Sequence, residues 1–343
     1  MIKQANDEAI RQAADIIRNG GIVGMPTETV YGLAANALDG AAVARVFAAK
    51  GRPSFNPLIV HVCDADAAAQ YVRMDARAKA VADAFWPGPL TLILPRKLPP
   101  SIPPASGGEE VAQAALGGEY CISDLVSAGL PTLAVRVPAH AVAQRLLKAC
   151  KVPLAAPSAN RSGSLSPTTP LHVAEGLGDA VNMILATGAC DVGLESTVLD
   201  LSGDAPVILR PGAITAEDIT AVLDDDVTYD SGNGLDVKSP GQLLKHYAPE
   251  TPVRLNAIDV KDGEALLAFG PTKFMVGRDF PGDRLRNLSE GQDLYEAAAH
   301  LFAMLKDLDR PEHSAIAVMQ IPQTGLGIAI NDRLRRAAQG SKP

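Results

Sequence analysis

Apolar residues recur along this chain at two spacings, and each spacing indicates a different secondary structure. In residues 7–19, Ile10, Ala13, Ala14 and Ile17 recur at three- and four-residue intervals, which predicts an amphipathic helix. The apolar run 21–25 that follows is short and is bounded by polar residues, as in a buried strand. This exchange of helical segments and short apolar runs continues to about residue 218 and predicts an α/β domain.

The same reading assigns the other elements of this first domain. We expect helices over residues 40–49, 75–85 and 139–150. We expect strands over residues 58–62, 90–94, 132–137, 183–187, 195–201 and 207–210. Leu154–Ala156 ends a further apolar run, and a small-residue loop follows it.

Composition changes after Asp218. Residues 224–242 are rich in Asp, Ser, Gly and Asn, which is typical of a linker. From residue 252 a second, smaller α/β pattern begins, with Leu294, Ala298, Leu301 and Leu305 on one helix face. We therefore divide the chain into a domain over 1–218, a linker over 219–250 and a domain over 251–343, in which we see no catalytic cluster.

Bulk composition narrows the function classes. The 343 residues suffice for about two domains, and the formal net charge of −8 argues against a broadly basic surface for nucleic acid, although a local basic cleft stays open. The four cysteines are far apart, so neither a zinc ribbon nor a redox Cys-x-x-Cys motif is expected. We find no leader peptide and no membrane-spanning run, and expect a cytoplasmic protein without a membrane partner.

Polar residues gather near the predicted strand ends, and each has an ordinary explanation beside a functional one. Lys50 and Arg52 suit a helix C-terminus, or an anion. Arg136 interrupts an apolar strand and needs a carboxylate, from the protein or from a ligand. His61 fits a core strand position, and Ser158 with Asn160 fits a turn or one shared ligand.

The chemistry that is missing also points in one direction. The chain has no phosphate-binding Gly-x-x-x-x-Gly-Lys loop, no Gly-x-Gly-x-x-Gly after a strand, no nucleophile elbow and no paired metal-ligand spacing. What remains is a set of cations and neutral hydrogen-bonding residues. Such a set fits catalysis by positioning and charge neutralisation, as in phosphoryl or nucleotidyl transfer.

Several motifs, taken together, resemble the Sua5/YrdC family over about residues 7–220. They are Pro26-Thr-Glu-Thr-Val-Tyr-Gly-Leu33, Lys50-Gly-Arg-Pro-Ser-Phe-Asn-Pro-Leu58, Trp86-Pro-Gly-Pro-Leu-Thr91, Ala134-Val-Arg-Val-Pro138, Ala156-Pro-Ser-Ala-Asn160, Glu195-Ser-Thr197 and Leu209-Arg-Pro-Gly212. The stretch Lys245-His-Tyr-Ala-Pro249 and the second domain resemble the longer Sua5 form. The resemblance implies a twisted open mixed sheet flanked by helices, with a Rossmann-like second domain.

The resemblance also implies a reaction, in which L-threonine, bicarbonate and ATP give L-threonylcarbamoyladenylate and pyrophosphate. The product would pass to a threonylcarbamoyl transferase complex that modifies adenosine 37 of tRNA, so stable nucleic-acid binding is not required. Magnesium is expected with ATP. The threonine site would be Thr29, His61, Arg136 and Ser196. The nucleotide site would be Lys50, Arg52, Asn56, Thr132, Ser158, Asn160, Thr168 and Arg210, with Lys50, Arg52, Ser158 and Asn160 catalytic. Tyr247 would close over the site, and we expect it and the linker to order when nucleotide binds.

The segment 97–130 departs from the family pattern, because it is long and rich in Gly and Pro. It precedes Thr132 directly, whereas Arg136 lies inside a matching motif. Two other functions stay open from the sequence: a nucleotide- or RNA-binding module without turnover, and a carbamoyl-transfer enzyme. Oligomeric state and selectivity for threonine over serine are not decided.

Overall fold

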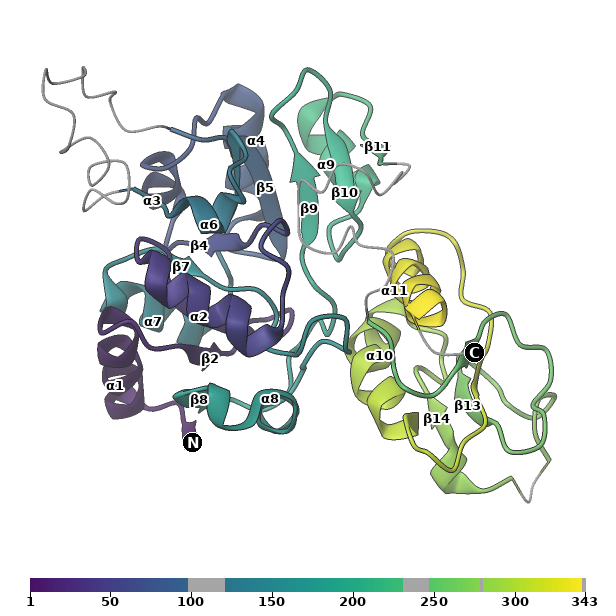
Figure 1. Cartoon of the computed structure of the whole chain (residues 1–343). Helices are drawn as coiled ribbons and strands as arrows, with labels where there is room; N and C mark the ends of the chain where they lie inside the picture. Colours follow the sequence, from purple (N-terminus) through teal and green to yellow (C-terminus); the bar gives the residue numbers. More distant parts are fainter. Residues whose placement is uncertain (98–120, 231–246, 278–279, 341–343) are drawn as a thin grey trace, which may run out of the picture.

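Two sheets of unequal size organise the chain, as the computed structural model in Figure 1 shows. The structure describes residues 1–97, 121–230, 247–277 and 280–340. Most of the Gly/Pro-rich segment and half of the predicted linker therefore lie outside the described residues, as does the part of Lys245–Pro249 before Tyr247. The predicted fold class, a mixed sheet flanked by helices with a smaller second α/β domain, is confirmed.

The large sheet has eleven strands in the order β1-β8-β2-β3-β7-β4-β6-β5-β9-β10-β11, and it mixes parallel and antiparallel pairs. Its strands are β1 (Ile2–Gln4), β2 (Val23–Met25), β3 (Gly32–Asn36), β4 (Ile59–His61), β5 (Leu90–Pro95), β6 (Thr132–Arg136), β7 (Leu154–Ala155), β8 (Met183–Ala186), β9 (Thr197–Asp200), β10 (Val207–Arg210) and β11 (Thr228–Tyr229).

Helices cover this sheet, and their caps follow from the sequence. Asn6 accepts a hydrogen bond from the Ala9 amide at the start of α1, and Asp7 and Glu8 complement the dipole in its first turn. Gly51 ends α2 in the left-handed conformation, with φ at 60°. The helices are α1 (Asp7–Arg18), α2 (Gly40–Lys50), α3 (Ala65–Ala69), α4 (Ala76–Phe85), α6 (Asp124–Ser127), α7 (Ala141–Cys150), α8 (Pro170–Leu177) and α9 (Ala216–Leu223), with the 3₁₀ turn η1 (Gly178–Ala180).

Strand register brings the polar motifs together at the ends of neighbouring strands. In the parallel pair β4 and β6, His61 lies beside Arg136. In the antiparallel pair β5 and β6, Thr91 lies beside Arg136, and β5 in turn runs parallel to β9 from Leu90 and Thr197 onward. The end of β6 and the starts of β5 and β9 therefore meet, and side chains from these distant segments come within reach of one another.

The second sheet is wholly parallel, in the order β12-β15-β13-β14. Its elements are β12 (Val253–Arg254), β13 (Ala265–Ala268), the 3₁₀ turn η2 (Gly282–Arg284), β14 (Leu285–Asn287), α10 (Leu294–Leu308), β15 (Ile316–Val318) and α11 (Leu326–Gly340). The predicted apolar face of α10 is confirmed, because Ala298, Leu301 and Leu305 are buried and Leu294 packs against the same core.

The ordered first unit extends further than the sequence suggested. Helix α9 runs through Leu223, and β11 then adds to the large sheet beside β10, so residues 219–230 belong to this unit rather than to the linker. The Asp-rich stretch hides this continuation, because β11 is only two residues long and both are exposed.

The two units are in close contact. Gly193, with φ at 70°, lies against the backbone of α10, where an added Cβ would stand 2.5 Å from the Ala299 Cα atom. Lys306 of α10 also makes an ion pair of 2.7 Å with Glu175 of α8. Across the ranges described, no helix combines the length and the apolar character that a membrane crossing requires.

Candidate functional site

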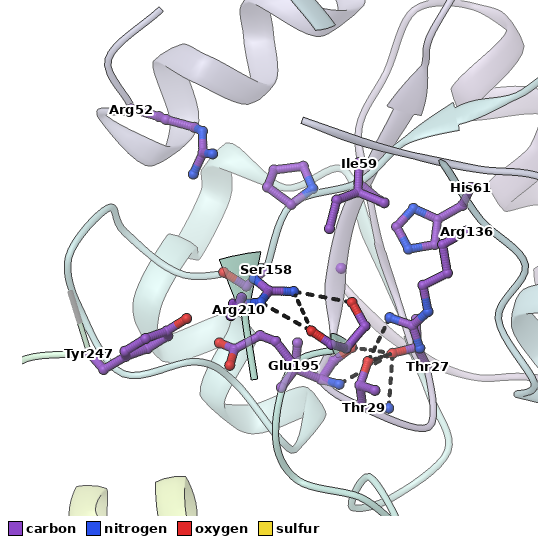
Figure 2. A pocket seen from close by; sticks show the side chains of 15 residues that line it. Thr27, Thr29, Arg52, Ile59, His61, Arg136, Ser158, Glu195, Arg210 and Tyr247 are labelled. Atoms are coloured by element: carbon purple, nitrogen blue, oxygen red, sulfur yellow. Dashed lines mark hydrogen bonds between the residues drawn. The ribbon is translucent and has the colours of Figure 1, made fainter. Parts of the chain in front are cut away.

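A pocket opens where the edge of the large sheet faces the second unit, and it encloses about 510 Å³, counting the part open to solvent. Figure 2 shows its side chains converging from segments far apart in the sequence. The lining residues are Thr27, Thr29, Val30, Gly32, Arg52, Ile59, His61, Arg136, Ala156, Pro157, Ser158, Glu195, Ser196, Arg210 and Tyr247.

Arg136 is held at one end of this pocket by three acceptors. Its Nη1 donates to Thr29 Oγ1 at 2.9 Å, its Nη2 to Glu28 Oε1 at 2.6 Å, and its Nε to the Gly88 carbonyl at 3.2 Å. Burial alone would raise the pKa of Glu28, but the charge and hydrogen bond of Arg136 outweigh it, and the net pKa is lowered. A protein carboxylate thus partners this buried arginine, and the guanidinium still faces the pocket.

His61 and Ile59 extend from the same face of β4 into the pocket, because alternate residues of a strand point the same way. Burial and the adjacent charge of Arg136 lower the pKa of His61 to about 3. The imidazole is therefore neutral at neutral pH. Its Nδ1 atom has no hydrogen-bond partner among the described residues. A neutral imidazole beside Arg136, with one ring nitrogen open to a hydrogen bond, suits a polar group of a ligand.

Arg210, at the end of β10, holds the second wall. Its Nε and Nη2 donate to the Ser196 carbonyl at 3.1 and 3.0 Å, and Nη2 also donates to the Ser196 hydroxyl at 3.1 Å. That hydroxyl lies 2.7 Å from Thr91 Oγ1. Burial lowers the pKa of Arg210. The arginine therefore fixes the orientation of Ser196 while its own charge stays at the pocket.

Arg52 occupies the rim, in the loop that follows α2. Its Nε donates to the Asn56 carbonyl at 3.1 Å, and its Nη2 donates to Asn56 Oδ1 at 2.6 Å and to the Pro57 carbonyl at 2.8 Å. Burial, followed by the charge of Arg210, lowers the pKa of Arg52 to about 10. A guanidinium whose pKa is lowered by the charge of a second guanidinium is a ready site for an anion.

Lys50 does not line this pocket. Its Nζ donates to the carbonyls of Ser158 and Asn160, both at 2.6 Å, and approaches Asn160 Oδ1 at 3.4 Å. Burial, with a smaller contribution from Arg52, holds the pKa of Lys50 well below its usual value. Ser158 Oγ donates to Asn160 Oδ1 at 2.6 Å. Lys50 and Asn160 therefore hold the loop that presents Ser158.

Tyr247 closes the side of the pocket that faces the second unit. Its ring is buried, lies 5.4 Å from the Phe302 ring of α10, and is covered by the Arg333 guanidinium of α11 at 5.5 Å. Burial, followed by the charge of Glu195, raises the pKa of Tyr247 to about 12. The phenol is therefore un-ionised, and the second unit fixes its position.

The structure brings together eight of the thirteen residues that the sequence singled out: Thr29, Arg52, His61, Arg136, Ser158, Ser196, Arg210 and Tyr247. Three more lie behind the lining and form hydrogen bonds to the loops that carry Ser158 and Arg52: Lys50, Asn56 and Asn160. Thr168 is buried outside the lining, near His172. Thr132 begins β6, about 13 Å of strand from Arg136, and does not line this pocket, so its place at the nucleotide stays a prediction.

Sequence reasoning did not select Thr27, Ile59, Glu195 or Arg333. Ile59 could have been found from its two-residue spacing to His61, and Thr27 and Glu195 from the motifs that contain them. Arg333 gives no such signal, because the sequence around it is that of an ordinary charged helix.

The arrangement suits charge neutralisation better than metal-centred or nucleophilic chemistry by the protein. No three His, Cys, Asp or Glu side chains are grouped as metal ligands within the described ranges. The two carboxylates near the pocket, Glu28 and Glu195, are each bound to an arginine, at 2.6 Å by Arg136 and at 3.0 Å by Arg333. Three arginines and five hydroxyls line one hollow, which can hold a polyanion beside a small polar molecule.

Comparison with known proteins agrees with this geometry. A family model described as "Telomere recombination", for Sua5, YciO and YrdC, matches residues 15–212. A second, described as "Threonylcarbamoyl-AMP synthase, C-terminal domain", matches residues 214–339. Relatives named threonylcarbamoyl-AMP synthase include one from Pyrococcus abyssi, 37% identical over 96% of this chain and 94% of its own. Another, from Bacillus subtilis, is 38% identical over 98% of this chain and 94% of its own.

A solved structure, P. abyssi Sua5 complexed with L-threonine, is similar over 99% of this chain and 97% of its own. Its TM-score is 0.82, at 34% sequence identity.

Proposed function

This chain belongs to the Sua5 family of threonylcarbamoyl-AMP synthases, and we propose that the pocket beneath Tyr247 joins L-threonine, bicarbonate and ATP. The products are L-threonylcarbamoyladenylate, pyrophosphate and water. The observation that carries this assignment is the convergence of Arg52, Arg136 and Arg210 on one hollow that is also lined by a neutral histidine and five hydroxyls.

Threonine occupies the end formed by Thr29, His61, Arg136 and Ser196. Arg136 provides a planar donor fork for the amino-acid carboxylate, and Glu28 holds that fork in place from behind. The neutral ring of His61 accepts or donates one hydrogen bond without adding charge. The carboxylate end of threonine is thereby fixed, and its nitrogen faces the remainder of the pocket.

ATP occupies the other end, near Arg52, Ser158 and Arg210. The threonine nitrogen takes up bicarbonate with loss of water to form a carbamate, and a carbamate oxygen then attacks the α-phosphorus. The bond from that phosphorus to the bridging oxygen breaks, and pyrophosphate leaves. Charge builds on the phosphate oxygens during this step, so fixed guanidinium groups stabilise the transition state more than the ground state.

Lys50, Asn56 and Asn160 contribute by holding the loops that carry these groups. Magnesium enters with ATP as part of the substrate, since both pocket carboxylates are already bound to arginines. Closure by Tyr247 keeps water from the carbamate, which decomposes readily when it is solvated.

The adenylate is a reactive mixed anhydride, so it must be consumed close to its source. We place this reaction in the cytoplasm, ahead of a threonylcarbamoyl transferase complex that modifies adenosine 37 of tRNA.

Pyrophosphate release tests the proposal directly. The purified chain should release pyrophosphate from ATP with magnesium only when L-threonine and bicarbonate are both present. Release that needs neither would contradict it. Release that needs bicarbonate and a different acceptor would support the carbamoyl-transfer alternative. Binding of tRNA or nucleotide without release would support the binding-module alternative.

A further inference from the structure

Arg333 of α11 is the largest side chain of the second unit that is fully buried, and it lies at the boundary with the first unit. Its Nε donates to Glu195 Oε2 at 3.0 Å, and its Nη1 donates to the Pro211 carbonyl at 2.7 Å. Its guanidinium also covers the Tyr247 ring, 5.5 Å from the ring centroid. One side chain of the second unit thus contacts three segments that form the pocket.

Each residue that Arg333 contacts either lines the pocket or is adjacent in sequence to a residue that does. Glu195 lines the pocket itself and precedes Ser196, and Pro211 follows Arg210 directly. Figure 2 shows the Glu195 side chain between Tyr247 and Arg210. Glu195 is therefore a negative charge in the wall of a pocket whose other charges are positive, and Arg333 is bonded to it from the far side.

A purely stabilising role does not account for this placement. The Nη2 atom of Arg333 is buried without a hydrogen-bond partner among the described residues. A buried donor without a partner is destabilising, and apolar side chains often replace buried ion pairs without loss of stability. Arg333 Nη1 also donates to Asp332 Oδ2 at 3.0 Å, so the guanidinium here serves better as a counter-charge for Glu195 and Asp332 than as a packing element.

We propose that Arg333 is a positioning residue that neutralises Glu195 and holds Tyr247, so that the second unit makes the pocket fit for a triphosphate. The inference rests on the proposed function, because it takes ATP to bind beside Glu195. When Arg333 is absent, Glu195 loses this counter-charge and presents more negative charge to the phosphates. The amino-acid end of the pocket, at Arg136, is unaffected.

The test compares Arg333→Met, Arg333→Lys and the double variant Arg333→Met with Glu195→Gln, in the full chain. Arg333→Met should raise KM for ATP, and the equilibrium dissociation constant of a non-hydrolysable ATP analogue, about ten- to a hundredfold. KM for threonine should change less than about twofold. The double variant should recover most of the ATP affinity, because the carboxylate of Glu195 is removed together with its counter-charge, and Arg333→Lys should lie between.

Arg254→Met is the matched control. Arg254 also makes a two-bond ion pair within the second unit, with Glu264 at 2.8 and 2.6 Å, and it does not line the pocket. This control should lose stability without a change in KM for ATP.

Two outcomes overturn the inference. One is unchanged ATP affinity in Arg333→Met. The other is a loss of affinity that Glu195→Gln does not restore while melting temperature falls, which would make Arg333 structural only. If the unsubstituted chain releases no pyrophosphate, the proposed function fails, and analogue binding in the same variants still decides the role of Arg333.

Discussion

Arg52 and Lys50 lie only two residues apart, but the structure gives them different surroundings, and substitution should separate them. Arg52 lines the pocket, whereas Lys50 donates to the loop carbonyls of Ser158 and Asn160. Arg52→Ala should lower kcat by about 10²–10³, as for loss of one fixed charge in a transition state. Lys50→Ala should lower kcat less, because Lys50 acts only through the loop that carries Ser158. Both variants should lose about 1–3 kcal/mol of stability, because each leaves buried carbonyls without donors.

Pyrophosphate release and urea unfolding, measured on both variants, check this difference. Arg45→Ala is a suitable control, since Arg45 also belongs to α2 and donates to a backbone carbonyl, that of Gly20, away from the pocket. An equal loss of kcat in the Lys50 and Arg52 variants would contradict the assignment of Lys50 to the supporting layer.

His61 should make folding stability sensitive to acid. Its pKa is about 3 in the folded chain against 6.5 as a free side chain, so between these values the unfolded chain binds one more proton. The His61 contribution is fully present above pH 6.5 and is lost as pH falls, at about 1.4 kcal/mol per pH unit. Urea unfolding from pH 4 to 7 should show a shallower slope for His61→Phe than for the unsubstituted chain. Parallel slopes would show that His61 titrates normally.

Strand alternation predicted some site residues and misled on others. Ser158 and Asn160 follow β7, so the alternation of a strand would place both side chains on one side. The backbone N–H of Asn160, however, donates a hydrogen bond to the Ser158 carbonyl at 3.0 Å. That turn sends Ser158 to the pocket and Asn160 toward Lys50. Thr132 and Arg136 share a strand face but occupy opposite ends of β6. Which end of a strand reaches the pocket depends on the neighbouring strands, and the sequence does not identify these.

At the scale of elements, the turn after β10 depends on a glycine. A Cβ on Gly212 would lie 2.3 Å from the Thr197 amide nitrogen and 2.8 Å from the Glu195 carbonyl oxygen. These are backbone atoms, so the clash can be relieved only if β9 and the preceding residues Glu195 and Ser196 shift. Gly212→Ala should therefore cost about 1–3 kcal/mol or more and also lower activity, because Ser196 moves.

Gly203→Ala is the matched control for this turn. Gly203 lies between β9 and β10, and a Cβ there would meet nothing within 4 Å. Urea midpoints and pyrophosphate release should be near those of the unsubstituted chain. If Gly212→Ala behaves like this control, the close packing of the turn on β9 is not needed for the site.

The elements themselves were largely predictable, because their spacing is strong and their caps are local. Helices α1, α2, α4 and α7 and strands β4, β5 and β10 lie within a few residues of the predicted ranges. Strand β3, Gly32–Asn36, gave no signal, since its short, small-residue run has no clear period. Strand order was beyond reach, because it is set by pairings between segments more than a hundred residues apart, such as β3 with β7.

At the scale of the whole molecule, the sequence predicted two domains but not that the second one completes the site. The reason is physical: Tyr247 packs in the core of the second unit while its ring edge lines a pocket of the first. Arg333 spans the same boundary. Such contacts depend on how two folded units dock, which no local pattern encodes. The docking itself is therefore part of the catalytic machinery and can be perturbed without touching a pocket residue.

Gly193 offers that perturbation. It has φ at 70° and lies against α10, where a Cβ would stand 2.5 Å from Ala299 Cα and 2.6 Å from the Ala298 carbonyl oxygen. Gly193→Ala should push the second unit away from the first. Gly129 has φ at 76° with nothing within 4 Å, so Gly129→Ala carries the same left-handed strain, about 1–2 kcal/mol, without the clash.

Small-angle scattering should give a larger radius of gyration for Gly193→Ala than for Gly129→Ala. KM for ATP should rise in the first variant only, because displacement of α10 and α11 withdraws Tyr247 and Arg333 together. Both variants should keep the large sheet folded, as far-ultraviolet circular dichroism can verify. Normal ATP affinity in a Gly193→Ala chain with a demonstrably larger radius would mean that the pocket is complete within the first unit, and that the second unit serves another purpose.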